Sequence, residues 1–331
     1  MTVAVRSFAK INLGLYIGAR RPDGFHDLRT VYQTIALHDI IRISTARGSG
    51  FEILCADPRV PLDSSNTCHR IAERVLQKIK PRSRVFIEIE KRLPVQGGLG
   101  AASSNAVATM LGIEKALRKR LSGPERLRVA SQVGSDLPLF VVGGTVLGVG
   151  HGEEVYPLPD LPSLPLVVVT PNVGVSTPRA FADWDALADQ SAPEIHRQLT
   201  APPSSDKLFE VGCALSAWLT GTPDAGAPAV KSGGRVGSLL SDLVRAGIEN
   251  DFERVVFSQI PELRDIKRAL LRAGSKYASL SGSGSALYGL FESEKAAVKA
   301  AQALRKHGLK AKATRTLTRR ECSKWAFVAG R

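Results

Sequence analysis

The sequence is poor in cysteine and has no long hydrophobic run, and both absences exclude classes of protein. The chain has only four cysteines, which lie far apart and form no C-x-x-C pair: Cys55, Cys68, Cys213 and Cys322. We therefore expect neither a disulfide framework nor a zinc site, and a reducing compartment suits these thiols. No apolar stretch reaches the roughly 18–20 residues of a membrane span, and residues 1–11 lack the apolar core of a signal peptide. We expect a soluble, cytoplasmic protein without membrane contact.

Negative charge is also scarce, because 45 Lys and Arg residues stand against 31 Asp and Glu and give a formal net charge of +14. Such an excess attracts polyanions, which include nucleic acid, acidic membranes and phosphorylated small molecules. Part of it lies near the C-terminus, between Lys306 and Lys324. A solvated basic face explains this cluster as well as a ligand does, so charge alone does not select a function.

Length and residue pattern predict a mixed α+β protein of two domains, because 331 residues exceed one average domain. Strand patterns occupy residues 4–17, 40–53, 84–90 and 164–169, and helical spacing occupies 66–79, 103–119 and 124–132. The last third predicts helices at 252–260, 262–273 and 294–307 and strands at 277–280, 286–291 and 311–316. We place the domains at 1–160 and 161–331. Pro and Gly are dense at 202–237, which predicts a mobile loop or inserted segment.

A glycine-rich segment between a predicted strand and a predicted helix is the most informative part of the sequence. Gly97, Gly98 and Gly100 can adopt positive φ and expose backbone N–H groups, and Ser103 and Ser104 suit a helix N-cap. A loop that enters a helix N-terminus in this way suits a polyphosphate, although a tight turn would explain the glycines too. No Gly-Lys-Ser/Thr follows, so the segment is not a P-loop.

Polar residues outside this loop have ordinary explanations when each is taken alone. Lys10 and Asn12 share one side of the first predicted strand, which fits a solvated strand face. Phe25 and His26 follow a Pro-Asp-Gly turn and suit packing. Asp136 lies just beyond a helix that ends near Gly134, where an aspartate commonly caps a turn.

Taken together, these segments resemble the GHMP kinases. The pattern Pro-x-x-x-Gly-Leu-Gly-x-x-Ser-Ser spans residues 94–104, and residues 279–286 are similar to the third glycine-rich motif of that superfamily. The opening, Ala-Lys-Ile-Asn-Leu followed by Arg-Arg-x-Asp-Gly-Phe-His, is similar to the diphosphocytidyl-methylerythritol kinases of the non-mevalonate isoprenoid pathway. The family resemblance implies an N-terminal domain like domain 2 of ribosomal protein S5 and a ferredoxin-like C-terminal domain.

The resemblance also implies roles for individual residues. Lys10 and Asp136 would be catalytic. The substrate would contact Asn12, Phe25, His26 and Phe181, with the cytosine sandwiched between the two phenylalanines and its edge read by the histidine. ATP would contact Asn66, Lys91, Pro94, Val95, Gln96, Gly97, Gly98, Leu99, Gly100, Ala101, Ala102, Ser103 and Ser104.

The implied reaction is phosphorylation of the 2-hydroxyl of 4-diphosphocytidyl-2-C-methyl-D-erythritol by ATP and Mg²⁺, with no carboxylate cluster dedicated to the metal. The expected partners are therefore small molecules and not nucleic acid, and the expected state is a monomer or weak homodimer. Another GHMP kinase, such as homoserine kinase, is the alternative within enzymes. A basic RNA-binding protein is the alternative of another class, but residues 306–320 interleave no aromatic side chain with the basic ones.

Overall fold

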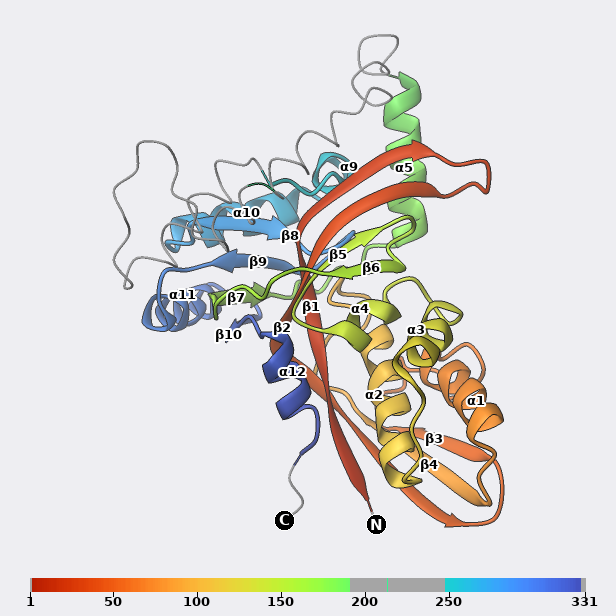
Figure 1. Cartoon of the computed structure of the whole chain (residues 1–331). Helices are drawn as coiled ribbons and strands as arrows, with labels where there is room; N and C mark the ends of the chain where they lie inside the picture. Colours follow the sequence, from red (N-terminus) through yellow and green to blue (C-terminus); the bar gives the residue numbers. More distant parts are fainter. Residues whose placement is uncertain (1, 191–212, 214–247, 329–331) are drawn as a thin grey trace.

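The computed structural model describes residues 2–190, 213 and 248–328 as two β-sheets with helices packed on them (Figure 1). The expected loop at 202–237 lies outside the described residues, apart from residue 213. Within the described part of the chain, no helix is long and apolar enough to cross a membrane.

The N-terminal half forms a six-stranded sheet in the order β3-β4-β2-β5-β6, with β1 paired to β2. Its strands are β1 (Val3–Arg20), β2 (His26–Arg47), β3 (Phe51–Cys55), β4 (Ser83–Glu90), β5 (Thr145–Val149) and β6 (Glu154–Pro157). The helices of this half are α1 (Thr67–Ile79), α2 (Ala101–Ala116), α3 (Gly123–Ser131) and α4 (Leu137–Val142). The antiparallel pair β1–β2 runs through the middle of the molecule (Figure 1).

Strand β2 is longer than the sequence pattern predicts, and the predicted strand at residues 40–53 is confirmed only in part, because two strands share it. A turn at residues 48–50 divides this segment between β2 and β3, and Gly48 and Gly50 both have positive φ there. The predicted strand at 4–17 is confirmed as one continuous strand. The short helix α4 was not expected; its proline is tolerated because it lies in the first turn.

The C-terminal half forms a four-stranded antiparallel sheet in the order β10-β7-β9-β8. Its strands are β7 (Pro165–Val169), β8 (Tyr277–Leu280), β9 (Leu287–Leu290) and β10 (Ala311–Arg315). The described helices are α5 (Thr177–Gln190), α9 (Phe252–Gln259), α10 (Pro261–Arg272), α11 (Glu294–Lys306) and α12 (Arg319–Trp325). Strands and helices follow one another here as in a ferredoxin-like unit, so the expected α+β class is confirmed.

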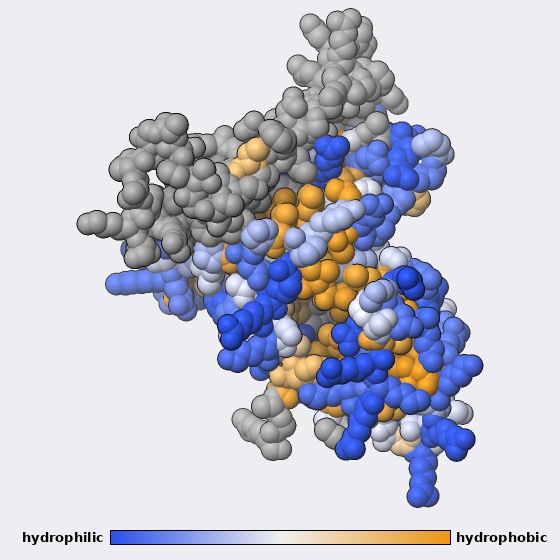
Figure 2. All heavy atoms as spheres, viewed as in Figure 1, coloured by the Kyte–Doolittle hydropathy of each residue, from blue (hydrophilic) through white to orange (hydrophobic). Residues whose placement is uncertain are grey.

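The two sheets share a hydrophobic core along β1 and β2. Ile11, Leu13 and Ile35 from these strands are buried with Leu166 of β7 and Tyr288 of β9, and the Tyr288 hydroxyl donates to the Asn12 carbonyl at 2.7 Å. On the face seen in Figure 2, apolar side chains gather near the middle of the molecule. Strand β1 is thus held from both sides, which fixes the polar side chains that it carries.

The last described residues return to the N-terminal sheet. The Leu317 amide donates to the Thr34 carbonyl at 2.9 Å, and the Val328 amide donates to the Ala4 carbonyl at 2.9 Å. Residues from both ends of the sequence therefore contact the N-terminal sheet. The division into domains at residue 160 stays a prediction.

Gly112 tests how closely α2 packs on β2. A Cβ at Gly112 would lie 2.5 Å from Ile43 Cγ1 and 3.3 Å from Val5 Cγ2, both in the buried core. We expect Gly112→Ala to lower the free energy of unfolding by about 1–2 kcal/mol, because overpacking outweighs the better helix propensity of alanine. Gly123→Ala, which would meet nothing within 4 Å, serves as the matched control in denaturant titrations. Equal stability of the two variants would contradict the packing described.

Candidate active site

A buried lysine lies where the two halves meet. Lys10 on β1 is 3% exposed, and its ammonium donates to Asn12 Oδ1 at 2.7 Å and lies 3.9 Å from Asp136 Oδ2. Alternation along β1 puts Lys10 and Asn12 on the same face, and Asn12 Nδ2 in turn donates to Thr30 Oγ1 at 2.7 Å. Burial lowers the pKa of Lys10, and the Asp136 carboxylate opposes that shift.

Asp136 occupies the N-cap position of α4, but its side chain is turned to other partners. Its side chain makes no capping hydrogen bond; Oδ1 instead accepts from the Tyr32 hydroxyl at 3.0 Å, while Oδ2 faces Lys10. Burial and the nearby Asp136 carboxylate raise the pKa of Tyr32 well above its usual value, so its hydroxyl stays protonated as a donor. The Asp136 side chain is 35% exposed, so an incoming hydroxyl can reach it.

Sequence reasoning missed Tyr32, although strand pairing places it in the site. The register of β1 and β2 puts Tyr32 directly across from Asn12, and directly paired residues share one face of a sheet. Lys10 Nζ also lies 5.7 Å from the centroid of the Tyr32 ring. Only a correct pairing of the first two strands, residue by residue, would have identified Tyr32 from the sequence.

The glycine-rich loop connects β4 to α2 and takes left-handed backbone at three positions. These are Gln96 (φ 57°), Gly98 (φ 71°) and Gly100 (φ 67°). The expectation of positive φ is thus confirmed for Gly98 and Gly100 but not for Gly97, whose place Gln96 takes. Gly100, and neither serine, is the N-cap of α2.

The two serines of the loop lie in the first turn of α2 and differ in their environment. Ser104 is buried and its hydroxyl is paired with Ser7 Oγ at 2.8 Å. Ser103 lines a pocket, and within the described residues its hydroxyl has no hydrogen bond. Ser103 is therefore the serine that can contact a ligand.

A second glycine-rich segment, residues 281–286, packs directly on the first. Ser281 Oγ donates to the Gly98 carbonyl at 3.0 Å, and the Ala286 amide donates to the Gly97 carbonyl at 3.1 Å. A Cβ on Gly98 would lie 2.0 Å from the Ser281 carbonyl oxygen, and one on Gly282 would lie 3.2 Å from Lys10 Nζ. Only glycine permits these approaches, which bring both loops against the lysine.

The loop borders a pocket of about 290 Å³ that is lined by the residues expected near ATP, except Ser104. Its lining includes Asn66, Lys91, residues 94–103 and Asn105. Asn66 is also the N-cap of α1, since its Oδ1 accepts from the Cys68 amide at 2.8 Å.

Asp39 anchors the start of the loop and was missed by sequence reasoning. This fully buried carboxylate pairs with Lys91 and accepts from the amides of Arg92 at 2.6 Å and Leu93 at 2.7 Å and from Asn105 Nδ2 at 3.0 Å. The Lys91 ammonium is thereby neutralised. No sequence pattern marks Asp39, because its partners lie more than 50 residues away.

The aromatic residues expected around a pyrimidine lie at the other end of β2, in a different arrangement. Phe25 is 62% exposed and packs on His151, with ring centroids 4.9 Å apart. The His26 ring stacks on Phe181 at 5.3 Å and 8°, and its Nε2 lies 2.7 Å from Asp185 Oδ1. Phe25 and Phe181 thus contact different rings, and the sandwich of cytosine between the two phenylalanines stays a prediction. Sequence reasoning missed His151 and Asp185.

Known proteins share this arrangement of fold and loops. A model described as the GHMP kinases N terminal domain matches residues 66–144, and one described as GHMP kinases C terminal matches residues 229–310. The first range contains the glycine-rich loop and Asp136, and the second contains residues 281–286. The chain is thus a GHMP kinase in class.

Curated relatives identify the family within the GHMP kinase class. A 4-diphosphocytidyl-2-C-methyl-D-erythritol kinase of Solibacter usitatus is 37% identical over 91% of this chain and 84% of its own length, and one of Moorella thermoacetica is 33% identical over 94% and 98%. A crystal structure of 4-(cytidine 5'-diphospho)-2C-methyl-D-erythritol kinase matches with a TM-score of 0.70 and 27% identity over 95% of this chain and 98% of that one. The chain belongs to the family of 4-diphosphocytidyl-2-C-methyl-D-erythritol kinases.

Homoserine kinase shares the fold. A homoserine kinase structure from Cytophaga hutchinsonii matches with a TM-score of 0.68 and 20% identity, over 96% of this chain and 95% of that one. At this identity the likeness shows a common fold alone.

Lys10→Met tests the electrostatics of the site without a substrate. Because burial lowers the pKa of Lys10, the folded state releases its proton at a lower pH than the unfolded chain does, whose lysine has the ordinary value of 10.5. At neutral pH Lys10→Met avoids the desolvation of the ammonium but leaves the buried Asn12 Oδ1 without its donor, so these two effects on stability oppose each other.

The way the stability difference between wild type and Lys10→Met changes with pH shows whether the fold favours the neutral or the charged form of Lys10. As pH rises toward 10.5 the unfolded wild type binds more protons than the folded form, so the wild type should gain stability relative to Lys10→Met. Urea titrations of both proteins between pH 7 and 10 measure the difference. A wild type that loses stability relative to the variant over this range would show that the fold stabilises the ammonium.

Proposed function

We propose that the protein transfers the γ-phosphoryl group of ATP to 4-diphosphocytidyl-2-C-methyl-D-erythritol, at the 2-hydroxyl, in the non-mevalonate isoprenoid pathway. The observation that carries this proposal is the Lys10–Asp136 pair, with Lys10 held beneath two interlocked glycine-rich loops, in a chain of this kinase family. Phosphoryl transfer requires alignment, neutralised phosphate charge and a group that takes up the alcohol proton.

Each of these requirements has a residue in the site. The hydroxyl oxygen attacks the γ-phosphorus, the bond to the β-phosphate oxygen breaks, and ADP leaves with that electron pair. Asp136 accepts the alcohol proton, because its carboxylate is held by Tyr32 yet remains open to solvent. Lys10 stabilises charge on the transferring group. An ionised aspartate is a weak base, so the proton moves late, after most of the bond to ADP has broken.

The glycine-rich loop would hold the ATP phosphates through its backbone amides and the N-terminus of α2. Mg²⁺ keeps most of its ligands as water and phosphate and needs one or two protein oxygens. The unengaged hydroxyl of Ser103 and the Asp136 carboxylate fit that limited role. The metal ion would neutralise phosphate charge during the transfer.

The distance between the two ends of the site fits a long substrate. His26 and Tyr32 lie six positions apart on β2, which is about 20 Å along a strand. A nucleoside diphosphate with a short polyol can span from the aromatic cluster to Asp136, with the cytosine against His26, Phe181 and Phe25 and the polyol beside Asn12. Homoserine is too small to contact both the aromatic cluster and Asp136. For this role we expect a cytoplasmic enzyme, monomeric or weakly dimeric, that does not bind nucleic acid.

Turnover with defined substrates tests this function. We expect Mg²⁺-dependent ATP consumption with the CDP-linked substrate and none with homoserine. Asp136→Asn should lower kcat by about 10²–10⁴-fold, the usual contribution of a general base, with KM little changed. Asp265→Asn, an exposed carboxylate on α10, controls for the charge change. Turnover of homoserine alone would refute the cytosine site, and near-normal turnover by Asp136→Asn would refute the base assignment.

Asp185 is expected to position His26 for binding of the nucleoside base. A carboxylate only accepts hydrogen bonds, so Asp185 requires the proton of neutral His26 on Nε2 and leaves Nδ1 as an acceptor for the base. We expect Asp185→Asn to raise KM for the CDP-linked substrate by about fivefold or more with kcat within twofold.

Asp183→Asn, on the same helix and facing Arg179, is the matched control for this prediction. ¹⁵N NMR of the labelled imidazole should show the Nε2–H form in the wild type and a mixture of tautomers in Asp185→Asn. An unchanged tautomer with an unchanged KM would exclude a positioning role for Asp185.

A further inference from the structure

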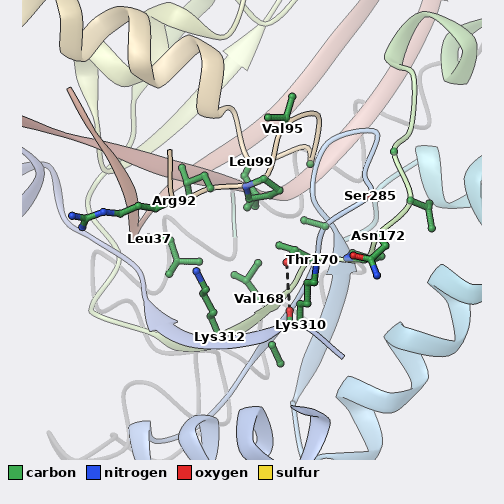
Figure 3. A pocket seen from close by; sticks show the side chains of 18 of the residues that line it. Leu37, Arg92, Val95, Leu99, Val168, Thr170, Asn172, Ser285, Lys310 and Lys312 are labelled. Atoms are coloured by element: carbon green, nitrogen blue, oxygen red, sulfur yellow. Dashed lines mark hydrogen bonds between the residues drawn. The ribbon is translucent and has the colours of Figure 1, made fainter. Parts of the chain in front are cut away.

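A second and larger cavity borders the glycine-rich loop and shares part of its lining with the pocket that contains Asn66. Its volume is about 940 Å³, within the usual range for small-molecule sites. The loop itself forms one wall through Pro94 and Val95, and Leu37 of β2 adds further apolar surface, whereas Leu99 and Val168 lie behind the wall and are almost fully buried (Figure 3). The proposed reaction leaves this cavity without a role.

Charge on the cavity wall is strongly one-sided. Six basic side chains and one carboxylate line it: Arg59, Lys91, Arg92, Arg305, Lys310, Lys312 and Asp57. Three of the six are already paired, Arg59 with Asp57, Lys91 with Asp39 and Arg92 with Glu90. Of the other three, Arg305 lies at the end of α11, Lys310 just before β10 and Lys312 on β10, and within the described residues none of them has a carboxylate partner.

The two lysines of this group point into the cavity. Lys312 lies on β10, the edge strand of the C-terminal sheet, and is paired in register with Val168. Lys310 lies two positions earlier and therefore on the same side of the chain. Figure 3 shows both side chains extending from β10 toward the loop that carries Leu99, with Lys312 next to Leu37. Apolar walls and unpaired cations thus face one common space.

We propose that this cavity binds an organic phosphate or diphosphate with an apolar body, and that its occupancy weakens ATP binding. The phosphate would contact Lys310 and Lys312, and the apolar part would cover Leu37, Pro94 and Val95. A ligand of this kind pairs with the lysines and also covers the apolar side chains of the cavity. A simple inorganic anion would leave that apolar surface exposed to water.

The coupling to ATP follows from the shared loop. Lys91, Val95, Gly97 and Leu99 border both this cavity and the smaller pocket. A polyanion in the cavity would lie next to the ATP phosphates, and like charges at short range repel. Each ligand must then weaken the other by the same factor. The site would make the kinase sensitive to an amphiphilic phosphate that is not its substrate.

Calorimetric titration of the full chain with hexyl diphosphate tests the proposal. We expect saturable binding, and we expect inorganic pyrophosphate and 1-hexanol each to bind at least about tenfold more weakly. The double variant Lys310→Ala/Lys312→Ala should lose about tenfold or more of the hexyl diphosphate affinity, which equals about 1.4 kcal/mol or more. Its KM for ATP without hexyl diphosphate should stay within twofold of the wild type.

Two control variants separate this cavity from other basic surfaces and from the ATP pocket. Lys306→Ala/Lys324→Ala removes the same charge at lysines outside the cavity lining and should leave the affinity unchanged. Asn66→Ala, in the smaller pocket alone, should weaken ATP but not hexyl diphosphate. Equal affinity of the wild type and the Lys310/Lys312 double variant would overturn the proposal. So would a loss of hexyl diphosphate affinity in Asn66→Ala with none in the double variant, because the probe would then occupy the ATP pocket.

Discussion

The buried ammonium of Lys10 is the interaction on which the arrangement of the site depends. Removing a lysine from water is expensive unless its donors are satisfied, and here Asn12 and Asp136 supply the partners. Asn12 is fixed by strand pairing, and Asp136 is brought in by the start of α4. Gly98 and Gly282 allow both glycine-rich segments to close around the lysine. Phosphate-binding backbone, cation and carboxylate therefore meet at one point between the two sheets.

Much of the fold and part of the site could be predicted from the sequence, because they depend on local rules. Alternation on the first strand places Lys10 and Asn12 together, and the glycine pattern requires unusual backbone at Gly98 and Gly100. Helical spacing located most helices within a few residues. Asp136 could be found only through the family resemblance, since an aspartate after a helix is commonly a cap.

The remaining parts depend on contacts between distant segments, which local patterns do not record. Tyr32 enters the site through the register of two strands, and Asp39 reaches the loop start from more than 50 residues away. Asp185 meets His26 only after α5 packs on the C-terminal half. The stacking of Phe181 on His26 likewise follows from how β2 and α5 lie against each other.

The most direct test of the central claim is ³¹P NMR of the purified protein with ATP, Mg²⁺ and the CDP-linked methylerythritol. We expect the γ-phosphate signal of ATP to be replaced by those of ADP and one new phosphomonoester, whose ³¹P signal shows no three-bond coupling to a proton because the 2-carbon carries a methyl group and no hydrogen. Formation of ADP and inorganic phosphate alone, or of a phosphoester on another hydroxyl, would contradict it.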